Sequence, residues 1–317
     1  MKDLIRKWRE ENAWHPFSVL AKKELADHIR SFRFIVLFVL VMLICVGSLY
    51  VVLSNIRDAA AQVDAENANL FLKIFTLSNG NLPPYFALLG LIGPLVGISL
   101  GFDAINAEMN KRTLGRILAQ PIPRDAVINA KFTAAAAAIS IMICSLSFFM
   151  IGFGIWFIGI PPTFEEFLRI LIFTIVTIIY IAFWINLSII FSTLFKQPAT
   201  SALTCIAIWL FFSVFYNILL SFLAGPSSTG GTSGWTYYLS QLSPNQIYSN
   251  VTSVLLTPGI RSAGPLSVSQ VAGSVPSPLP LQQSLLVIWP HLTTLIAGTF
   301  ICFGMAYLLF IRKEIRS

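Results

Sequence analysis

The chain has 317 residues, of which 56% are hydrophobic and 11% are charged, and its mean hydropathy is +0.77. A soluble domain carries about 25% charged residues, so this composition excludes a soluble enzyme, and it also excludes a disordered chain, which is poor in apolar residues. The net charge of +7 does not indicate nucleic-acid binding, because Lys and Arg lie almost wholly beside apolar runs. The sequence therefore predicts an all-α integral membrane protein.

The first predicted element is an amphipathic helix over about residues 15–33. Its apolar residues recur at helical spacing on one face, while Lys, Arg and Asp occupy the remainder. Such a helix lies in the inner membrane interface, with its cations against anionic lipid. An ordinary basic flank of a first span would account for the charges but not for the apolar stripe. The stripe consists of Phe17, Leu20, Ala21, Leu25, Ile29 and Phe32.

Six stretches are long and apolar enough to cross a bilayer, which takes about 20 mainly apolar residues. They lie at about 34–53, 84–105, 132–160, 168–195, 199–224 and 285–311. Segments on the side of the two termini hold 17 Lys and Arg residues, and those on the other side hold four. The positive-inside rule therefore predicts a multi-pass protein of the cytoplasmic (inner) cell membrane with both termini in the cytoplasm.

The spans themselves offer little for chemistry. They are almost free of ionisable groups, whereas an ion-coupled carrier keeps acids, bases or paired charges in mid-membrane. The four cysteines lie far apart inside apolar runs, so no metal or redox cluster is expected. In the second span, Gly93, Gly97 and Gly101 form a GxxxGxxxG series that lets helices approach closely. Packing within one subunit and a subunit interface both fit this series.

A run at residues 165–169, Glu-Glu-Phe-Leu-Arg, resembles the EExxxR run of intramembrane CAAX-type proteases. Its Arg comes one residue early, and only His291 follows on a later span, where those proteases need further histidines. The chain also lacks the GxxxxGK[ST] loop that cradles nucleotide phosphates. No catalytic, cofactor-binding or metal-binding residue is therefore expected here, and any ATP must be bound by a partner.

The loop at 106–131 is the most informative stretch, and it reads NAEMNKRTLGRILAQPIPRDAVINAK. Leu114 and Leu118 fall at helical spacing, and Pro121 and Pro123 break the helix. A connection alone needs about four residues, whereas this loop is 26 long and patterned. Apolar anchors inside a charged rim are typical of a docking helix, so we expect the loop to bind a partner protein.

Two motifs together resemble the membrane subunits of ABC transporters of the type-2 exporter family. The first is KELAD-x-IRSFRF in the amphipathic helix, and the second is E-x-x-x-x-T-L-x-x-x-L-x-x-P-I-x-R-x-x-x-x-x-x-K in the loop. The resemblance implies that residues 15–33 are an elbow helix and that 106–131 holds the coupling helix, which seats in a groove on an ATP-binding subunit. The matching positions are Glu108, Thr113, Leu114, Leu118, Pro121, Arg124 and Lys131, and Arg112 stands where the family often has Gly.

The resemblance further implies a permease subunit that performs no covalent chemistry. It would form the translocation path as a dimer, with a second copy or a related permease, and work as an exporter. Two ATP-binding cassette subunits would bind ATP and magnesium. Membrane lipid is the other expected partner, and no nucleic acid is expected.

The predicted extracytoplasmic segment at 225–284 holds a single charge, and Gly, Pro and Ser supply 27 of its 60 residues. Aromatic residues interrupt it, so part of it, about 236–256, is expected to lie on or dip into the outer leaflet. The segment would also suit an extracytoplasmic partner. A stand-alone membrane sensor, channel or intramembrane enzyme without an ATPase partner is the alternative from another class. It would need polar groups facing a cavity and would leave the 106–131 loop unexplained.

Overall fold

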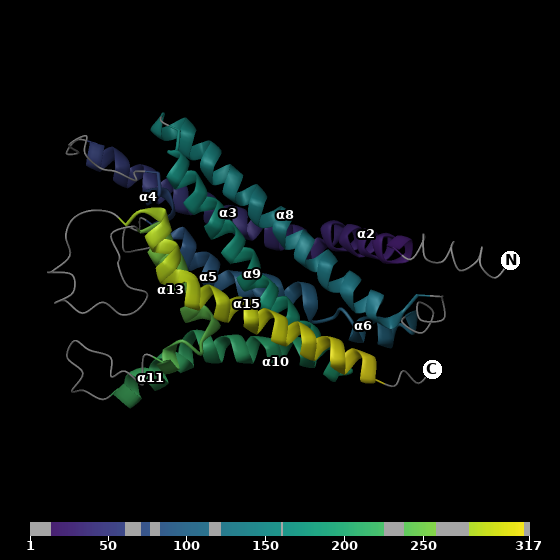
Figure 1. Cartoon of the computed structure of the whole chain (residues 1–317). Coiled ribbons are helices and arrows are strands. Elements are labelled where there is room, and N and C mark those ends of the chain that lie inside the picture. Colours follow the sequence, from purple (N-terminus) through teal and green to yellow (C-terminus); the bar gives the residue numbers. More distant parts are fainter. Residues whose placement is uncertain are drawn as a thin grey trace.

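The computed structural model describes residues 14–60, 71–76, 83–113, 122–159, 161–224, 238–257 and 279–313. Within these residues all regular structure is helical, and six helices are long and apolar enough to span a membrane. This confirms the prediction of an all-α membrane protein with six spans. The beginning of α2 and the end of α15 lie at the same end of the bundle, which we call the terminal end (Figure 1). The opposite end, which carries α13, is called the α13 end.

Six spanning segments make up the bundle. In chain order they are α3 (Phe32–Ala60), α5 (Tyr85–Gly101), α8 (Arg124–Ile158), α9 (Phe164–Leu194), the run from α10 (Pro198–Leu210) through the π-helical η1 (Phe211–Phe215) to α11 (Tyr216–Ala224), and α15 (Leu281–Arg312). Among the described residues, four shorter helices accompany them: α2 (Trp14–Arg30), α4 (Lys73–Thr76), α6 (Asn106–Asn110) and α13 (Pro244–Leu256). The third span begins at Arg124 rather than near 132, because α8 continues beyond the apolar run into the preceding loop.

Local sequence explains where several helices begin and end. α9 begins with a capping box, in which the Glu166 N–H donates to Thr163 Oγ1 and the Thr163 N–H donates to Glu166 Oε2. α8 ends before Gly159, whose φ of 76° is the left-handed conformation that glycine adopts without strain. α10 begins with Pro198, whose fixed φ suits a first helical position. These residues set the short connections between the third, fourth and fifth spans.

The fourth span, α9, is the central helix of the bundle, and α5 and α15 pack along it. The glycine series of α5 faces α9. A Cβ placed on Gly97 would lie 2.8 Å from the carbonyl oxygen of Ile181, and one on Gly93 would lie 3.1 Å from the Ile181 side chain. A Cβ on Gly101 would collide with Ser188. The three small residues therefore let α5 and α9 approach closely within this chain.

The fifth span lies at the periphery of the bundle. No residue of η1 is buried, and the side chains of Phe215, Ile218 and Phe222 are exposed. Apolar side chains with this exposure suit a surface that meets lipid or a second protein in the membrane.

The helix α13 falls within the 236–256 range that the sequence predicts at the outer leaflet. It packs against α5, α9 and α15 (Figure 1). Tyr248 of α13 is buried, and its ring stacks on that of Tyr180 in α9 with centroids 4.3 Å apart. In the structure α13 is therefore a packed part of the bundle. Most of the remaining 225–284 segment, including its predicted partner surface, lies outside the described residues.

Arg169 of α9 joins α9 to α13 and α15 at the α13 end. Its buried guanidinium donates to the carbonyl of Leu255 in α13 at 2.9 Å and to that of Leu279, just before α15, at 2.6 Å. It also donates to the hydroxyl of Ser284 in α15 and pairs with Glu165 at 2.8 Å. The run that resembles a protease motif thus acts as a junction of α9, α13 and α15.

Candidate functional site

The loop that the sequence predicts to dock a partner leaves α5 at the terminal end. Hydrogen bonds to α9 and to the turn after it hold the first helix of this loop, α6. Ser192 Oγ of α9 accepts the N–H groups of Ile105 at 2.9 Å and Asn106 at 3.3 Å. Asn110 Nδ2 donates to the carbonyl of Lys196, between α9 and α10, at 3.0 Å. The start of the loop is therefore a fixed part of the bundle.

An ion cluster centred on Lys131 joins three helices at this end. Lys131 Nζ of α8 lies 2.6 Å from Glu108 Oε1 of α6 and 3.2 Å from Glu24 Oε2 of α2. The side chain of Lys131 is 5% exposed, and those of Glu24 and Glu108 are 10% and 17% exposed. Buried charges that are paired resist separation, because removing one partner leaves the others without compensation. We call these three residues the Lys131 cluster.

Electrostatics within the cluster favour the ionised form of Glu24. Burial works against ionisation, but Lys131 and the neighbouring Lys23 outweigh it and hold the pKa of Glu24 below its ordinary value. A carboxyl group with a lowered folded-state pKa stabilises the fold above its unfolded pKa, and this stabilisation is lost as the pH falls through the folded value. The cluster should therefore loosen in acid.

A second ion pair lies close by, where α3 begins and α5 ends. Arg33 Nη1 lies 2.5 Å from Asp103 Oδ2, and its guanidinium stacks 5.2 Å above the ring of Phe102. The Arg33 side chain is 59% exposed, so this pair adds little stability by itself. It does orient the first span against the segment that leads into α6.

The structure brings together three of the residues that the family pattern selects. Besides the pair of Glu108 and Lys131, Thr113 Oγ1 donates to the Glu108 carbonyl at 3.3 Å. Arg124 is the first residue of α8 and is exposed. Leu114, Leu118 and Pro121 lie outside the described residues. The docking role of all these residues stays a prediction.

Sequence reasoning did not single out Glu24. The residue stands inside the KELAD run, where it reads as one charge among several on the polar side of a helix. Only the packing of α2 against α8 brings it to Lys131.

The backbone at Arg112 has an unusual conformation. Its φ of 55° lies in the left-handed region, and no other non-glycine residue in the described part of the chain has a positive φ. An L-residue with a Cβ is strained there by about 1–2 kcal/mol, whereas glycine is not. The family resemblance implies that Gly often stands at this position, and the left-handed turn after α6 is a conformation that glycine adopts without strain.

We expect the substitution Arg112→Gly to stabilise the protein by up to about 1 kcal/mol, because it relieves the left-handed strain. Thermal unfolding of the purified protein at neutral pH measures this gain. Lys111→Gly is the matched control, since Lys111 has an ordinary φ of −79° and glycine there only adds freedom to the unfolded chain. A lower melting temperature for Arg112→Gly would contradict the expectation.

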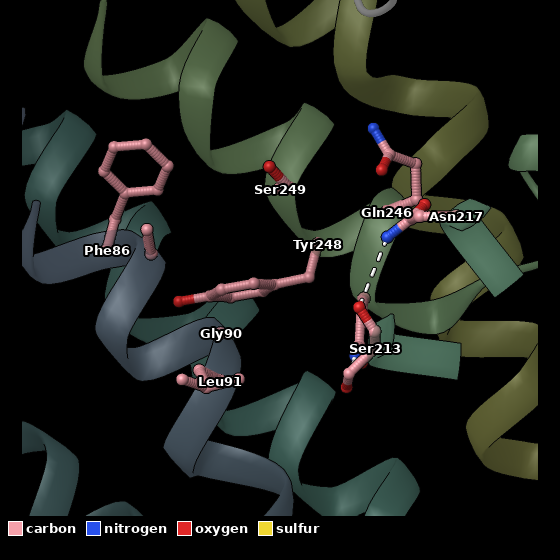
Figure 2. Close-up of a pocket in the computed structure, with 10 residues that line it drawn as sticks. Phe86, Gly90, Leu91, Ser213, Asn217, Gln246, Tyr248 and Ser249 are labelled. Atoms are coloured by element: carbon pink, nitrogen blue, oxygen red, sulfur yellow. Dashed lines mark hydrogen bonds between the residues drawn. The ribbon is translucent and has the colours of Figure 1, made fainter. Parts of the chain in front are cut away.

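A polar cavity of about 230 Å³ opens at the α13 end, between α5, the η1–α11 segment and α13 (Figure 2). Ser213 and Asn217 line it from the fifth span, and Gln246 and Ser249 line it from α13. Phe86, Leu91 and the backbone of Gly90 form the α5 side. The cavity is distant in sequence and position from the Lys131 cluster, which lies at the terminal end.

The geometry defines a class of protein: a multi-pass helical membrane protein with a patterned loop anchored by buried charges at one end. The sequence matches the model of the ABC-2 family transporter proteins over residues 18–315. The chain therefore belongs to this family, and it is a membrane permease of an ABC transporter. No curated protein matches it.

Proposed function

We propose that this chain is a permease subunit that two separate ATP-binding subunits drive through the 106–131 loop, with export as the direction. Two copies, or one copy and a related permease, form the translocation path. Both termini and the Lys131 cluster then face the cytoplasm, in agreement with the distribution of Lys and Arg. ATP and magnesium bind to the partner subunits.

The Lys131 cluster is the observation that carries this proposal. A docking loop transmits force only if it is attached to the helices that must move. Lys131 attaches α6 to α8 and to α2 through two short ion pairs. When the ATP-binding subunits close, a displacement of α6 therefore passes to the third span and to the elbow helix instead of being absorbed by the loop.

Affinity purification of the tagged chain from native membranes in mild detergent tests the partner directly. We expect a stoichiometric soluble protein with a phosphate-binding loop to copurify. Two copies of the chain with different tags, expressed together, show whether the permease pairs with itself. If no ATPase copurifies, even after crosslinking at residues 106–113, the proposal fails and a stand-alone sensor or channel becomes the better explanation.

Charge reversal of Arg124 tests the docking surface. Arg124 is exposed at the start of α8 and makes no ion pair with the described residues. We expect Arg124→Glu to lower the amount of copurifying ATPase about tenfold, which corresponds to about 1.4 kcal/mol of binding free energy. Lys22→Glu is the control, because it makes the same charge change at an exposed position of α2. Equal recovery of the ATPase with both variants would contradict a role for Arg124.

A further inference from the structure

We infer that the cavity between α5, the η1–α11 segment and α13 binds an uncharged solute that carries hydroxyl or amide groups (Figure 2). The inference rests on the proposed transport function, because it names the chemical class of the substrate. It is drawn from the groups that line the cavity, their exposure and the hydrogen bonds that fix them.

The cavity combines several neutral hydrogen-bonding groups. Asn217 and Gln246 each use one amide N–H within the described part of the chain: Asn217 Nδ2 donates to the Ser213 carbonyl and Gln246 Nε2 donates to Asn250 Oδ1. Their carbonyl oxygens and second N–H bonds remain available, so each amide can both accept from and donate to a ligand. Ser249 adds a hydroxyl that is exposed to the same cavity.

The lining argues against a charged ligand. Among the described residues that line the cavity there is no Asp, Glu, Lys, Arg or His. A charge that leaves water without a counter-charge loses several kcal/mol, so a lining of neutral polar and apolar groups disfavours an ionised solute. The absence of a cation in this lining also disfavours a phospholipid headgroup, since phosphate is recognised by Arg or Lys.

The lining is held in place before any ligand arrives. Asn245 of α13 donates through Nδ2 to Ser213 Oγ at 2.5 Å, and its Oδ1 lies 2.5 Å from the Tyr180 hydroxyl of α9. The same hydroxyl lies 2.8 Å from the Gly90 carbonyl of α5. One amide thus links the fifth span, α13 and the central helix. Preorganised polar groups of this kind reduce the entropy that a ligand must lose on binding.

The position of the polar groups also requires water or a solute. Asn217 is an exposed amide on a mostly apolar helix, and polar groups that face hydrocarbon are costly. The π-helical turn at η1 immediately precedes it, and such turns occur frequently at functional sites. The volume of about 230 Å³ is below the 300–1,000 Å³ range of pockets for drug-sized ligands, so the solute, or the part of it bound here, is small.

Reaction of a cysteine in the cavity with thiol reagents of different charge tests the inference. Cys45, Cys144, Cys205 and Cys302 are first replaced by alanine, and Ser213→Cys or Asn217→Cys is then introduced. The purified protein in lipid nanodiscs is treated with hydroxyethyl, trimethylammonium-ethyl or sulfonatoethyl methanethiosulfonate. These probes are neutral, cationic and anionic. Each rate is divided by the rate at which the same reagent reacts with a free thiol in solution. The same ratio is measured for Lys22→Cys, which is exposed outside the spans and serves as the reference position.

We expect the neutral reagent to react with Cys at 213 and at 217 at least tenfold faster than either charged reagent. Phe222→Cys, on the exposed apolar part of α11, should react slowly with all three. In the Ser213→Cys background, Asn217→Asp should raise the rate of the cationic reagent several-fold, because a carboxylate supplies the missing counter-charge. Equal rates for the three reagents, or no reaction at either position in protein that melts like the wild type, would overturn the inference.

The outcome is separable from that of the proposed function. The labelling experiment uses the permease without ATP, and its readout does not depend on a partner. If the labelling is charge-selective but no ATPase copurifies, the transport proposal fails and the neutral-solute site stands. A copurifying ATPase without charge selectivity would leave the transporter and refute the substrate class.

Discussion

Replacing Lys131 by glutamate is expected to abolish coupled ATPase activity and to destabilise the permease by about 3–5 kcal/mol, the usual cost of breaking a buried ion pair. The variant would bring three carboxylates together where Lys131 now lies 2.6 Å from Glu108 and 3.2 Å from Glu24. None of the three side chains is open enough to water to screen the repulsion. Thermal unfolding and ATP hydrolysis by the reconstituted complex measure the two effects.

A charge swap distinguishes the ion cluster from a simple loss of stability. Glu108→Lys combined with Lys131→Glu restores one cation and two carboxylates at the same place. We expect the double variant to recover much of the melting temperature that each single variant loses, with a coupling energy of about 1–3 kcal/mol in the double-mutant cycle. Additive losses would show that Lys131 and Glu108 do not act together. Lys22→Glu, on the exposed side of α2, controls for the change in net charge.

The two assays also separate attachment from docking. If the cluster transmits motion, the double variant Glu108→Lys, Lys131→Glu should regain more of its melting temperature than of its coupled ATPase activity. The short distance between Lys131 and Glu108 depends on side-chain lengths, and the swap exchanges them. Arg124→Glu should lower the recovery of the ATPase with no loss of melting temperature, since that side chain is exposed and its loss leaves the fold intact. Lys131→Glu should lower both, so equal melting temperatures for Arg124→Glu and Lys131→Glu would contradict separate roles.

The sequence predicts the spans well because the bilayer imposes a length and an apolar composition that each span carries by itself. The resemblance of the 106–131 loop to the exporter family also selects Glu108 and Lys131, and the structure brings these two residues together. The sequence does not predict Glu24 as their partner, or Asn245 and Tyr180 beside the cavity. These contacts join residues 65 or more positions apart and depend on how helices pack.

The sequence also does not say which neighbouring helix a glycine or a charged side chain faces. Gly93, Gly97 and Gly101 are compatible with either a subunit interface or internal packing until α9 is placed against them. The run at 165–169 resembles a catalytic motif only in its sequence. The packing of α13 and the start of α15 around Arg169 gives it a structural role instead.

Arg169→Met is expected to release α13 from the bundle and to lower the melting temperature strongly. The substitution keeps an apolar chain of similar length but removes every donor. The carbonyls of Leu255 and Leu279 would then lose the Arg169 bonds, and each unsatisfied buried acceptor costs about 1–3 kcal/mol. Arg169→Lys should recover only part of this loss, because an ammonium group lacks the planar fork that reaches acceptors on both sides.

Glu165→Gln is the matched control for this position. The Glu165 side chain is 48% exposed, so losing its ion pair with Arg169 should change stability by less than about 1 kcal/mol. Limited proteolysis within 238–257 should cut Arg169→Met much faster than wild type or Glu165→Gln, since α13 would leave its place against α9. Because α13 supplies Asn245 and Gln246, the same variant should lose charge selectivity at Ser213→Cys. If it melts like the wild type and resists the protease, Arg169 does not hold the α13 end, and other contacts must hold the cavity, such as the Asn245 hydrogen bonds and the stack of Tyr180 and Tyr248.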